Sequence, residues 1–269
     1  MSRPLHEKFK QLRSLRRKAL IPFLMGGSPS LAALGPLLLA LEDAGADIIE
    51  VGIPFSDPLA DGPVIQGASQ RALARGATPP KILEAIASVR HRLTAPIVAL
   101  CYWNPITQFG ANGAAGVGDF VRTARAAGIS GVIVPDLPVE EGAALRAASR
   151  GQFDTIFLAA PTSPPARLRL IARASEGFIY YVSVTGTTGV RRELPPTLVH
   201  GVRQIKLLTT KPVCVGFGIA TPAQARQVAR VADGVIVGSG LVRVIEQARS
   251  VSSAVRAAGA FVRRLRRAV

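Results

Sequence analysis

The sequence of 269 residues is poor in the residues that thiol and metal chemistry require. It contains two cysteines, Cys101 and Cys214, and three histidines, which are His6, His91 and His200. Two thiols make neither a disulfide framework nor a zinc-ligand spacing, and histidines this far apart make no metal cluster or catalytic triad. We therefore expect buried, inert thiols and no metal site.

Long hydrophobic runs are also missing. No stretch of about 18 consecutive apolar residues occurs, so the sequence predicts no membrane span. The first 20 residues are basic but lack the uninterrupted apolar stretch of a secretory signal. These two absences predict a cytoplasmic protein.

Acidic residues are scarce: 17 aspartates and glutamates face 33 lysines and arginines, giving a formal net charge of +16. Such a charge raises nucleic acid as a partner. However, the arginines are scattered at helix-surface spacing, and only 5% of residues are aromatic, which leaves few stacking platforms for bases. Nucleic-acid binding is therefore disfavoured, and a non-catalytic basic barrel that binds nucleic acid or a partner is the least favoured alternative.

One arginine cluster, at residues 263–267, is dense. Apolar residues recur there every three or four positions, which predicts a helix with one packed face and the arginines on the solvated face. The apolar positions are Val255, Ala258, Val262, Leu265 and Val269, and the arginines are Arg263, Arg264, Arg266 and Arg267.

The sequence does contain a regular alternation of short apolar runs with longer helical stretches. Continuously apolar runs are typical of parallel strands covered on both faces. Helix starts are indicated at Ser30, Thr78, Pro165 and Thr221, and an extra helix precedes the first strand. The eight runs cover 19–25, 47–51, 96–101, 131–134, 154–159, 178–184, 212–217 and 234–238.

Repeated strand–helix units predict a parallel sheet that is either closed into a barrel or open and doubly wound. Eight units over this length favour closure, and the first joint, MGGSPS, lacks the G-x-G-x-x-G of an open dinucleotide-binding sheet. We expect an α/β fold, a (βα)₈ TIM barrel with an extra N-terminal helix, in which residues 1–269 form a single domain. Chemistry then belongs at the C-terminal ends of the strands.

The segment EVGIPFSDPLADGPVIQ, residues 50–66, holds two candidate catalytic acids. Glu50 stands in an otherwise apolar strand, where desolvation raises the pKa of a carboxyl group, although a salt-bridged glutamate is an equal alternative there. Asp61 lies in a loop stiffened by three prolines, and two acids at one barrel mouth favour a proton-transfer pair. Asp57 precedes a proline, and such an aspartate often only caps a turn.

Glycines after the last two apolar runs indicate a phosphate site. Residues 215–218 read VGFG and residues 237–240 read VGSG, with Ser239 at the start of the final barrel helix. Backbone N–H groups and a helix N-terminus at this place bind phosphate in many barrels. Residues 183–189, SVTGTTG, predict a lid that orders over a ligand.

Five segments in one order carry a resemblance to a known family. They are IPFSDPLADGPVIQ, YWNPI, VPDLPVEE, YVSVTGTTG and GFGI followed by VGSG. Over nearly its whole length the sequence closely resembles the α subunit of tryptophan synthase. That resemblance implies a lyase of tryptophan biosynthesis that cleaves indole-3-glycerol phosphate into indole and glyceraldehyde 3-phosphate without a cofactor.

The resemblance also implies roles for individual residues. Glu50 is the acid–base residue, and Asp61 accepts the indole N–H and stabilises positive charge on the ring. The phosphate is held at Gly189, Gly218, Gly238 and Ser239, and Thr188 belongs to the lid. The indole pocket is lined by Phe23, Leu100, Tyr102 and Tyr180.

A pyridoxal-phosphate β subunit, in an α₂β₂ heterotetramer, is the partner that the resemblance implies, with Pro54, Asp57 and Asn104 at the docking surface. Two departures bear on that partner. Ser28 replaces the usual aspartate after the first strand, and residues 110–118, GANGAAGVG, resemble an insertion beside the docking loop. A stand-alone lyase that releases indole without a β subunit is therefore the main alternative.

Overall fold

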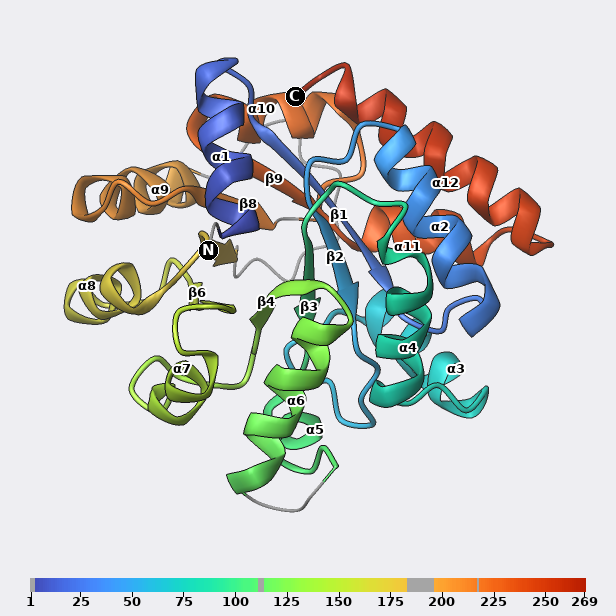
Figure 1. Ribbon diagram of the computed structural model, residues 1–269. Coiled ribbons are helices and arrows are strands. Elements are labelled where there is room, and N and C mark those ends of the chain that lie inside the picture. The colour runs from blue at the N-terminus through green and yellow to red at the C-terminus, as the bar shows by residue number, and fades with distance from the viewer. Residues whose placement is uncertain (1–2, 111–113, 183–195, 217) are drawn as a thin grey trace.

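In the computed structural model, which describes residues 3–110, 114–182, 196–216 and 218–269, nine parallel strands form one sheet at the centre of the molecule (Figure 1). Their order across the sheet is β5-β4-β3-β2-β1-β9-β8-β7-β6. The strands are β1 (Ala19–Met25), β2 (Ile49–Gly52), β3 (Ile97–Leu100), β4 (Ile129–Ile133), β5 (Asp154–Ile156), β6 (Leu158–Ala159), β7 (Ile179–Val182), β8 (Val213–Gly216) and β9 (Gly234–Val237).

The two outermost strands, β5 and β6, are separated in the chain by a single residue, Phe157. The run 154–159, predicted as one strand, is thus divided: β5 pairs with β4, and β6 pairs with β7. At the break the Phe157 carbonyl accepts from the Tyr180 N–H at 3.2 Å, while its own N–H turns to the Ser175 hydroxyl at 3.4 Å. The sheet therefore closes on itself, and the predicted α/β barrel is confirmed.

Helices surround this sheet in the ring that Figure 1 shows. The predicted starts at Ser30, Thr78 and Thr221 are confirmed as N-cap residues, and Pro165 is the first residue of its helix. The helices are α1 (Pro4–Ser14), α2 (Leu31–Asp43), α3 (Pro63–Ala74), α4 (Pro79–Arg90), α5 (Trp103–Thr107), α6 (Ala114–Ala126), α7 (Ala143–Ser149), α8 (Pro165–Ala174), α9 (Pro196–Leu208), α10 (Pro222–Val231), α11 (Ser239–Glu246) and α12 (Val251–Arg266).

The extra helix, α1, lies across the end of the barrel at which the strands begin. Its Phe9 ring packs 5.9 Å from that of Phe178, the residue before β7. Arg3, at its N-cap, reaches Asp154 at the first position of β5. Because α1 occupies part of this end, the opposite end, where the strands finish, is left for chemistry.

One expectation about the surface needs correction. The arginines near the C-terminus do not all lie on a solvated face: Arg266 is only 16% exposed and pairs with Asp47 at 2.6 Å, whereas Arg263, Arg264 and Arg267 are exposed. Within the predicted insertion at 110–118, residues 114–118 begin α6.

Both cysteines are buried free thiols, as expected. In the part of the chain that the structure describes, no group of three histidine, cysteine, aspartate or glutamate side chains is placed to hold a metal ion. Within the same residues, no helix is both long enough and apolar enough to cross a membrane.

Candidate active site

The register of β1, β2 and β3 places Glu50 inside the barrel. Glu50 lies beside Phe23 on one side and Val98 on the other, and Gly52 lies beside Leu100. Residues in register on parallel strands share a face, and alternate residues of one strand share it too. The side chains of Phe23, Glu50 and Leu100 therefore point to the same interior, and Glu50 is 0% exposed.

The Glu50 carboxyl has no hydrogen-bond partner among the described residues, at either oxygen. It is therefore not the salt-bridged glutamate that the sequence left open. Burial, and to a smaller extent the nearby carboxylate of Asp61, raise its pKa to about 8. A buried carboxyl group without a donor is costly when ionised, so Glu50 holds its proton at neutral pH.

Asp61 lies at the end of the loop that joins β2 to α3. The Tyr102 hydroxyl donates to its Oδ2 at 3.1 Å and accepts the Ala60 N–H at 3.0 Å. Burial raises the pKa of Asp61 to about 6, and the hydrogen bond from Tyr102 opposes that rise. Near neutral pH the two acids are thus in different states: Asp61 is ionised and Glu50 is protonated.

Two side chains of α3, which the sequence did not single out, fix this loop. The Gln66 amide donates to the carbonyl of Asp61 at 2.9 Å and to that of Pro58 at 3.3 Å. The Ser69 hydroxyl accepts the Phe55 N–H at 2.9 Å and donates to the Phe55 carbonyl at 2.8 Å. The sequence offered one signal for these two residues: both are polar and lie in the first two turns of the helix that directly follows the loop.

Two glycines, Gly52 and Gly216, leave room for aromatic side chains beside the two acids. A methyl group added at Gly52 would lie 2.7 Å from Cζ of Phe23, and one added at Gly216 would lie 2.4 Å from the Tyr180 hydroxyl oxygen. Burial and the charges of Glu50 and Asp61 raise the pKa of Tyr180. The structure thus brings Phe23, Tyr102 and Tyr180 to the same pair of carboxyl groups.

Two of the predicted phosphate residues, Gly238 and Ser239, follow β9, which pairs with β1 on the side opposite to β2. A methyl group added at Gly238 would lie 3.9 Å from Cβ of Phe23, and Ser239 is the first residue of α11. Gly218 is exposed, has a φ of +30°, and faces open space. Thr188, Gly189 and the predicted lid lie outside the described residues.

The predicted docking residues differ in exposure. Asp57 and Asn104 are exposed, whereas Pro54 is buried, so its side chain offers no surface to a partner. The same loop carries Leu59, which is 91% exposed. Its exposure could not be predicted from the sequence, where Leu59 is only an apolar residue between Pro58 and Ala60.

These features define a class of protein: a (βα)₈-barrel enzyme that brings together a buried interior glutamate, an aspartate on the loop after β2 and, beside Phe23, a helix that starts at Ser239. The family model described as "Tryptophan synthase alpha chain" matches residues 9–269. A tryptophan synthase alpha chain of Geobacter sulfurreducens is 47% identical over 262 residues, covering 97% of each chain. That of Gloeobacter violaceus is 49% identical over 242 residues, covering 89% of this chain and 86% of the relative.

Solved structures agree with the sequence matches. The tryptophan synthase subunit alpha of Legionella pneumophila superposes with a TM-score of 0.90 at 34% identity, covering 100% of this chain and 98% of the other. A chain of Mycobacterium tuberculosis tryptophan synthase gives 0.89 at 37% identity, covering 100% and 99%. The chain therefore belongs to the tryptophan synthase alpha chain family. It is a lyase of tryptophan biosynthesis that cleaves indole-3-glycerol phosphate and works as the alpha subunit with a beta subunit.

Proposed function

We propose that Glu50 and Asp61 divide the proton transfers of indole-3-glycerol phosphate cleavage between them, with Glu50 starting each turnover as the acid. The observation that carries this proposal is the partnerless, fully buried Glu50 carboxyl beside Asp61. A pKa of about 8 keeps Glu50 protonated at neutral pH, so it is ready to give a proton rather than to take one.

The reaction balances with one proton moving through Glu50. The protonated carboxyl donates to the indole carbon that bears the glycerol phosphate chain, and the ring becomes a cation. The resulting carboxylate of Glu50 then takes the proton of the substrate's own hydroxyl group, on the chain carbon next to the indole ring. The carbon–carbon bond breaks, its electron pair returns to the ring, and indole and glyceraldehyde 3-phosphate leave while Glu50 is again protonated.

Asp61 matches the charge that this sequence creates. Its ionised carboxylate accepts the indole N–H, which becomes more acidic as the ring gains positive charge. A fixed, partly buried anion stabilises such a cation without rearranging at the moment of reaction. Tyr102 holds the Asp61 carboxylate by its hydrogen bond of 3.1 Å, and the loop is held to α3 by Gln66 and Ser69.

The indole ring fits between the aromatic and apolar side chains around the acids, which are Phe23, Leu100, Tyr102 and Tyr180. The phosphate then lies at Gly218, Gly238 and Ser239, where the N-terminus of α11 favours an anion. Thr188 and Gly189 complete this site in our proposal on the strength of the sequence alone.

Replacing Glu50 by glutamine tests the central step, because glutamine keeps the shape of the side chain but cannot exchange this proton. We expect Glu50→Gln to lose indole release by at least about a thousandfold, in the range that loss of a general acid–base group produces, while indole propanol phosphate still binds. Turnover near that of the unchanged protein would contradict the proposal.

For the beta subunit we propose a docking surface formed by Asp57, Leu59 and Asn104, with buried Pro54 shaping the loop rather than touching the partner. An exposed leucine beside the catalytic loop suits a partner that covers it. We expect Leu59→Ser to reduce stimulation of cleavage by the beta subunit but not the basal rate. A cytoplasmic location, an α₂β₂ assembly and a single domain over residues 1–269 complete the proposal.

A further inference from the structure

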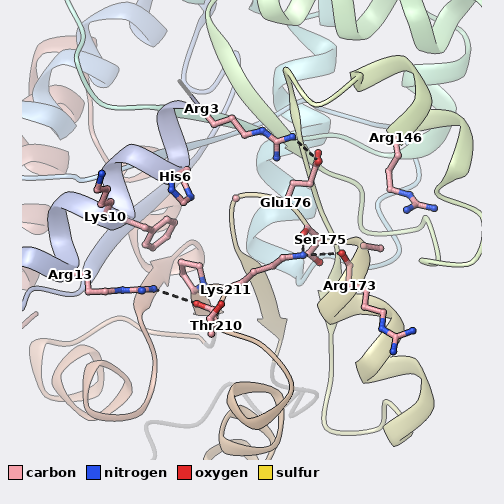
Figure 2. A pocket seen from close by; sticks show the side chains of 14 residues that line it. Arg3, His6, Lys10, Arg13, Arg146, Arg173, Ser175, Glu176, Thr210 and Lys211 are labelled. Carbon is pink, nitrogen blue, oxygen red and sulfur yellow. Dashed lines mark hydrogen bonds and ion pairs between the residues drawn. The ribbon is translucent and has the colours of Figure 1, made fainter. Parts of the chain in front are cut away.

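A cavity of about 600 Å³ lies at the barrel end opposite to Glu50 and Asp61. Its walls come from α1 on one side, from α7 and α8 on the other, and from segments just before β7 and β8 (Figure 2). Of the described residues that line it, Glu176 is the one carboxylate. The basic residues that line it are Arg3, Lys10, Arg13, Arg146, Arg173 and Lys211.

Two of these cations hold the walls together. Arg3 pairs with Asp154 at 3.4 Å and with Glu176 at 3.1 Å. The Lys211 ammonium donates to the carbonyls of Ala172, Arg173 and Ser175 at 2.9, 2.9 and 2.6 Å, at the C-terminal end of α8. Both side chains are therefore structural, and they contribute a fixed positive field rather than free donors.

The other four cations are less engaged. The side chains of Lys10, Arg146 and Arg173 make no hydrogen bond or ion pair with any other described residue. Arg13 uses one N–H on the Thr210 carbonyl at 3.3 Å. Concave walls that carry charge of one sign concentrate the electrostatic potential. The unpaired cations therefore repel one another until an anion binds between them.

A neighbouring hollow contains fewer unpaired cations. Of the basic residues that line it, Arg17 pairs with Asp47 at 3.4 Å and Lys18 pairs with Asp233 at 3.6 Å. Arg13 also lines the first cavity, and Arg16 makes no ion pair with a described residue. Unpaired basic side chains are thus more numerous around the first cavity than around this hollow. Large hydrophobic side chains exposed among the described residues are all leucine or valine, so no aromatic platform for nucleic-acid bases accompanies the charge.

We propose that this cavity binds a compact di- or triphosphate group. The unpaired cations stand on both walls, with Lys10 and Arg13 on α1, Arg146 on α7 and Arg173 on α8. A ligand with several linked anionic groups can engage cations of both walls at the same time. Arginine forks bind phosphate oxygens in pairs, and a cavity of this volume matches a small ligand rather than a polymer.

The test is a calorimetric titration of the intact protein with inorganic tripolyphosphate and with ATP. Glycerol 3-phosphate is kept at saturation throughout, so that the catalytic phosphate site is filled. We expect one saturable site that weakens as salt rises, and a loss of affinity of at least tenfold in Arg146→Gln/Arg173→Gln, in keeping with the loss of two charge-assisted contacts. Similar binding of both probes indicates that the phosphates alone are recognised, whereas preference for ATP indicates a nucleotide.

The matched control is Arg226→Gln/Arg256→Gln, which removes two exposed arginines on α10 and α12. This control is expected to bind tripolyphosphate as the unchanged protein does, and both double variants are expected to cleave substrate normally. Equal weakening in the two variants would show that net charge alone is responsible and would overturn the proposal. So would the absence of saturable binding, or an oligonucleotide that binds the same site more tightly than either probe.

Discussion

At the scale of single residues, the protonation of Glu50 is tied to the stability of the fold. The ordinary pKa of 4.5 applies to the unfolded chain, and burial raises the pKa in the folded chain to about 8. Between these values the unfolded state releases a proton that the folded state keeps. Folding stability therefore falls as pH rises from 4.5 to 8 and is constant above that window.

Glu50→Gln removes this dependence because the amide does not titrate. Its buried amide also lacks partners, but that cost does not change with pH. We expect the free energy of unfolding of the variant, relative to the unchanged protein, to increase by on the order of 4 kcal/mol between pH 5 and pH 9. Urea unfolding across that pH range measures this difference, and Glu84→Gln, at an exposed position on α4, is the control. A difference that stays constant with pH would count against a raised pKa of Glu50.

Tyr102 acts on Asp61 in the opposite sense, since its hydrogen bond favours the ionised carboxylate. In Tyr102→Phe the pKa of Asp61 rises above its value of about 6 by about one unit, since a hydrogen bond of this kind contributes on the order of 1.4 kcal/mol. The acid limb of kcat/KM against pH then moves to higher pH, while the alkaline limb set by Glu50 stays near 8. Tyr181→Phe, on the opposite face of the same strand as Tyr180, is the control and leaves both limbs in place.

The sequence predicted both acids because each has a local signature: a lone carboxyl in an apolar strand, and an aspartate among prolines. It did not predict that Tyr102 binds Asp61. That contact joins residues 41 positions apart, and it depends on the pairing of β2 with β3, which brings the end of β3 beside the loop after β2. Phe23 and Gly52 show the same limit, since their close approach depends on the register of two strands.

At the scale of elements, α3 and α11 carry the two halves of the site. The loop that ends in Asp61 leads into α3, and Ser239 begins α11. Glu246, the last residue of α11, accepts the Arg71 Nε–H from α3 at 2.6 Å and the Ser28 hydroxyl from the loop after β1. Ser28, which stands where the family usually has aspartate, therefore has a partner of its own in this chain.

Glu246→Gln weakens this link without changing the size of the side chain. Because Arg71 is 47% exposed, we expect only about 1 kcal/mol of lost stability, well below that of a buried pair. We also expect a higher KM for indole-3-glycerol phosphate, since the phosphate end shifts relative to the acid end. Thermal unfolding and steady-state kinetics measure the two effects; behaviour identical to that of Glu84→Gln would show that the link does not position the site.

Gly238→Ala tests the phosphate end more directly. The added methyl meets Ile65 at 3.6 Å and Phe23 at 3.7 Å, which are ordinary contacts, so the chain is expected to fold normally. The methyl would nevertheless crowd the backbone at which we propose that the phosphate lies, and we expect KM to rise about tenfold for the loss of roughly 1.4 kcal/mol of binding. An unchanged KM would remove Gly238 from the phosphate site.

The elements themselves were well predicted where the periodicity is strong. Eight apolar runs correspond to strands, and helix starts at Ser30, Thr78 and Thr221 are N-cap residues. The division of 154–159 was not predicted because nothing in DTIFLA interrupts its apolar character. It arises from the closure of the sheet, which gives each half of the run a different neighbour.

At the scale of the whole molecule, the basic side chains that give the net charge of +16 differ in whether they have acidic partners. Some arginines form ion pairs that hold segments together, as Arg266 does with Asp47 and Arg3 does with Asp154. Others remain unpaired around the cavity at the strand-start end. The total charge follows from the sequence, but this concentration was not predicted, because Lys10 and Arg13 lie more than a hundred positions before Arg146 and Arg173 in the chain.

The proposed proton transfers depend most on Glu50 keeping its proton at neutral pH. Carbon-13 NMR of the protein labelled at the glutamate side-chain carboxyl carbons measures this directly, with Glu50→Gln to identify the Glu50 signal. We expect one glutamate resonance that titrates near pH 8 and disappears in the variant. If the signal lost in the variant titrates instead near the ordinary value of 4.5, Glu50 is ionised at neutral pH and cannot open the reaction as an acid.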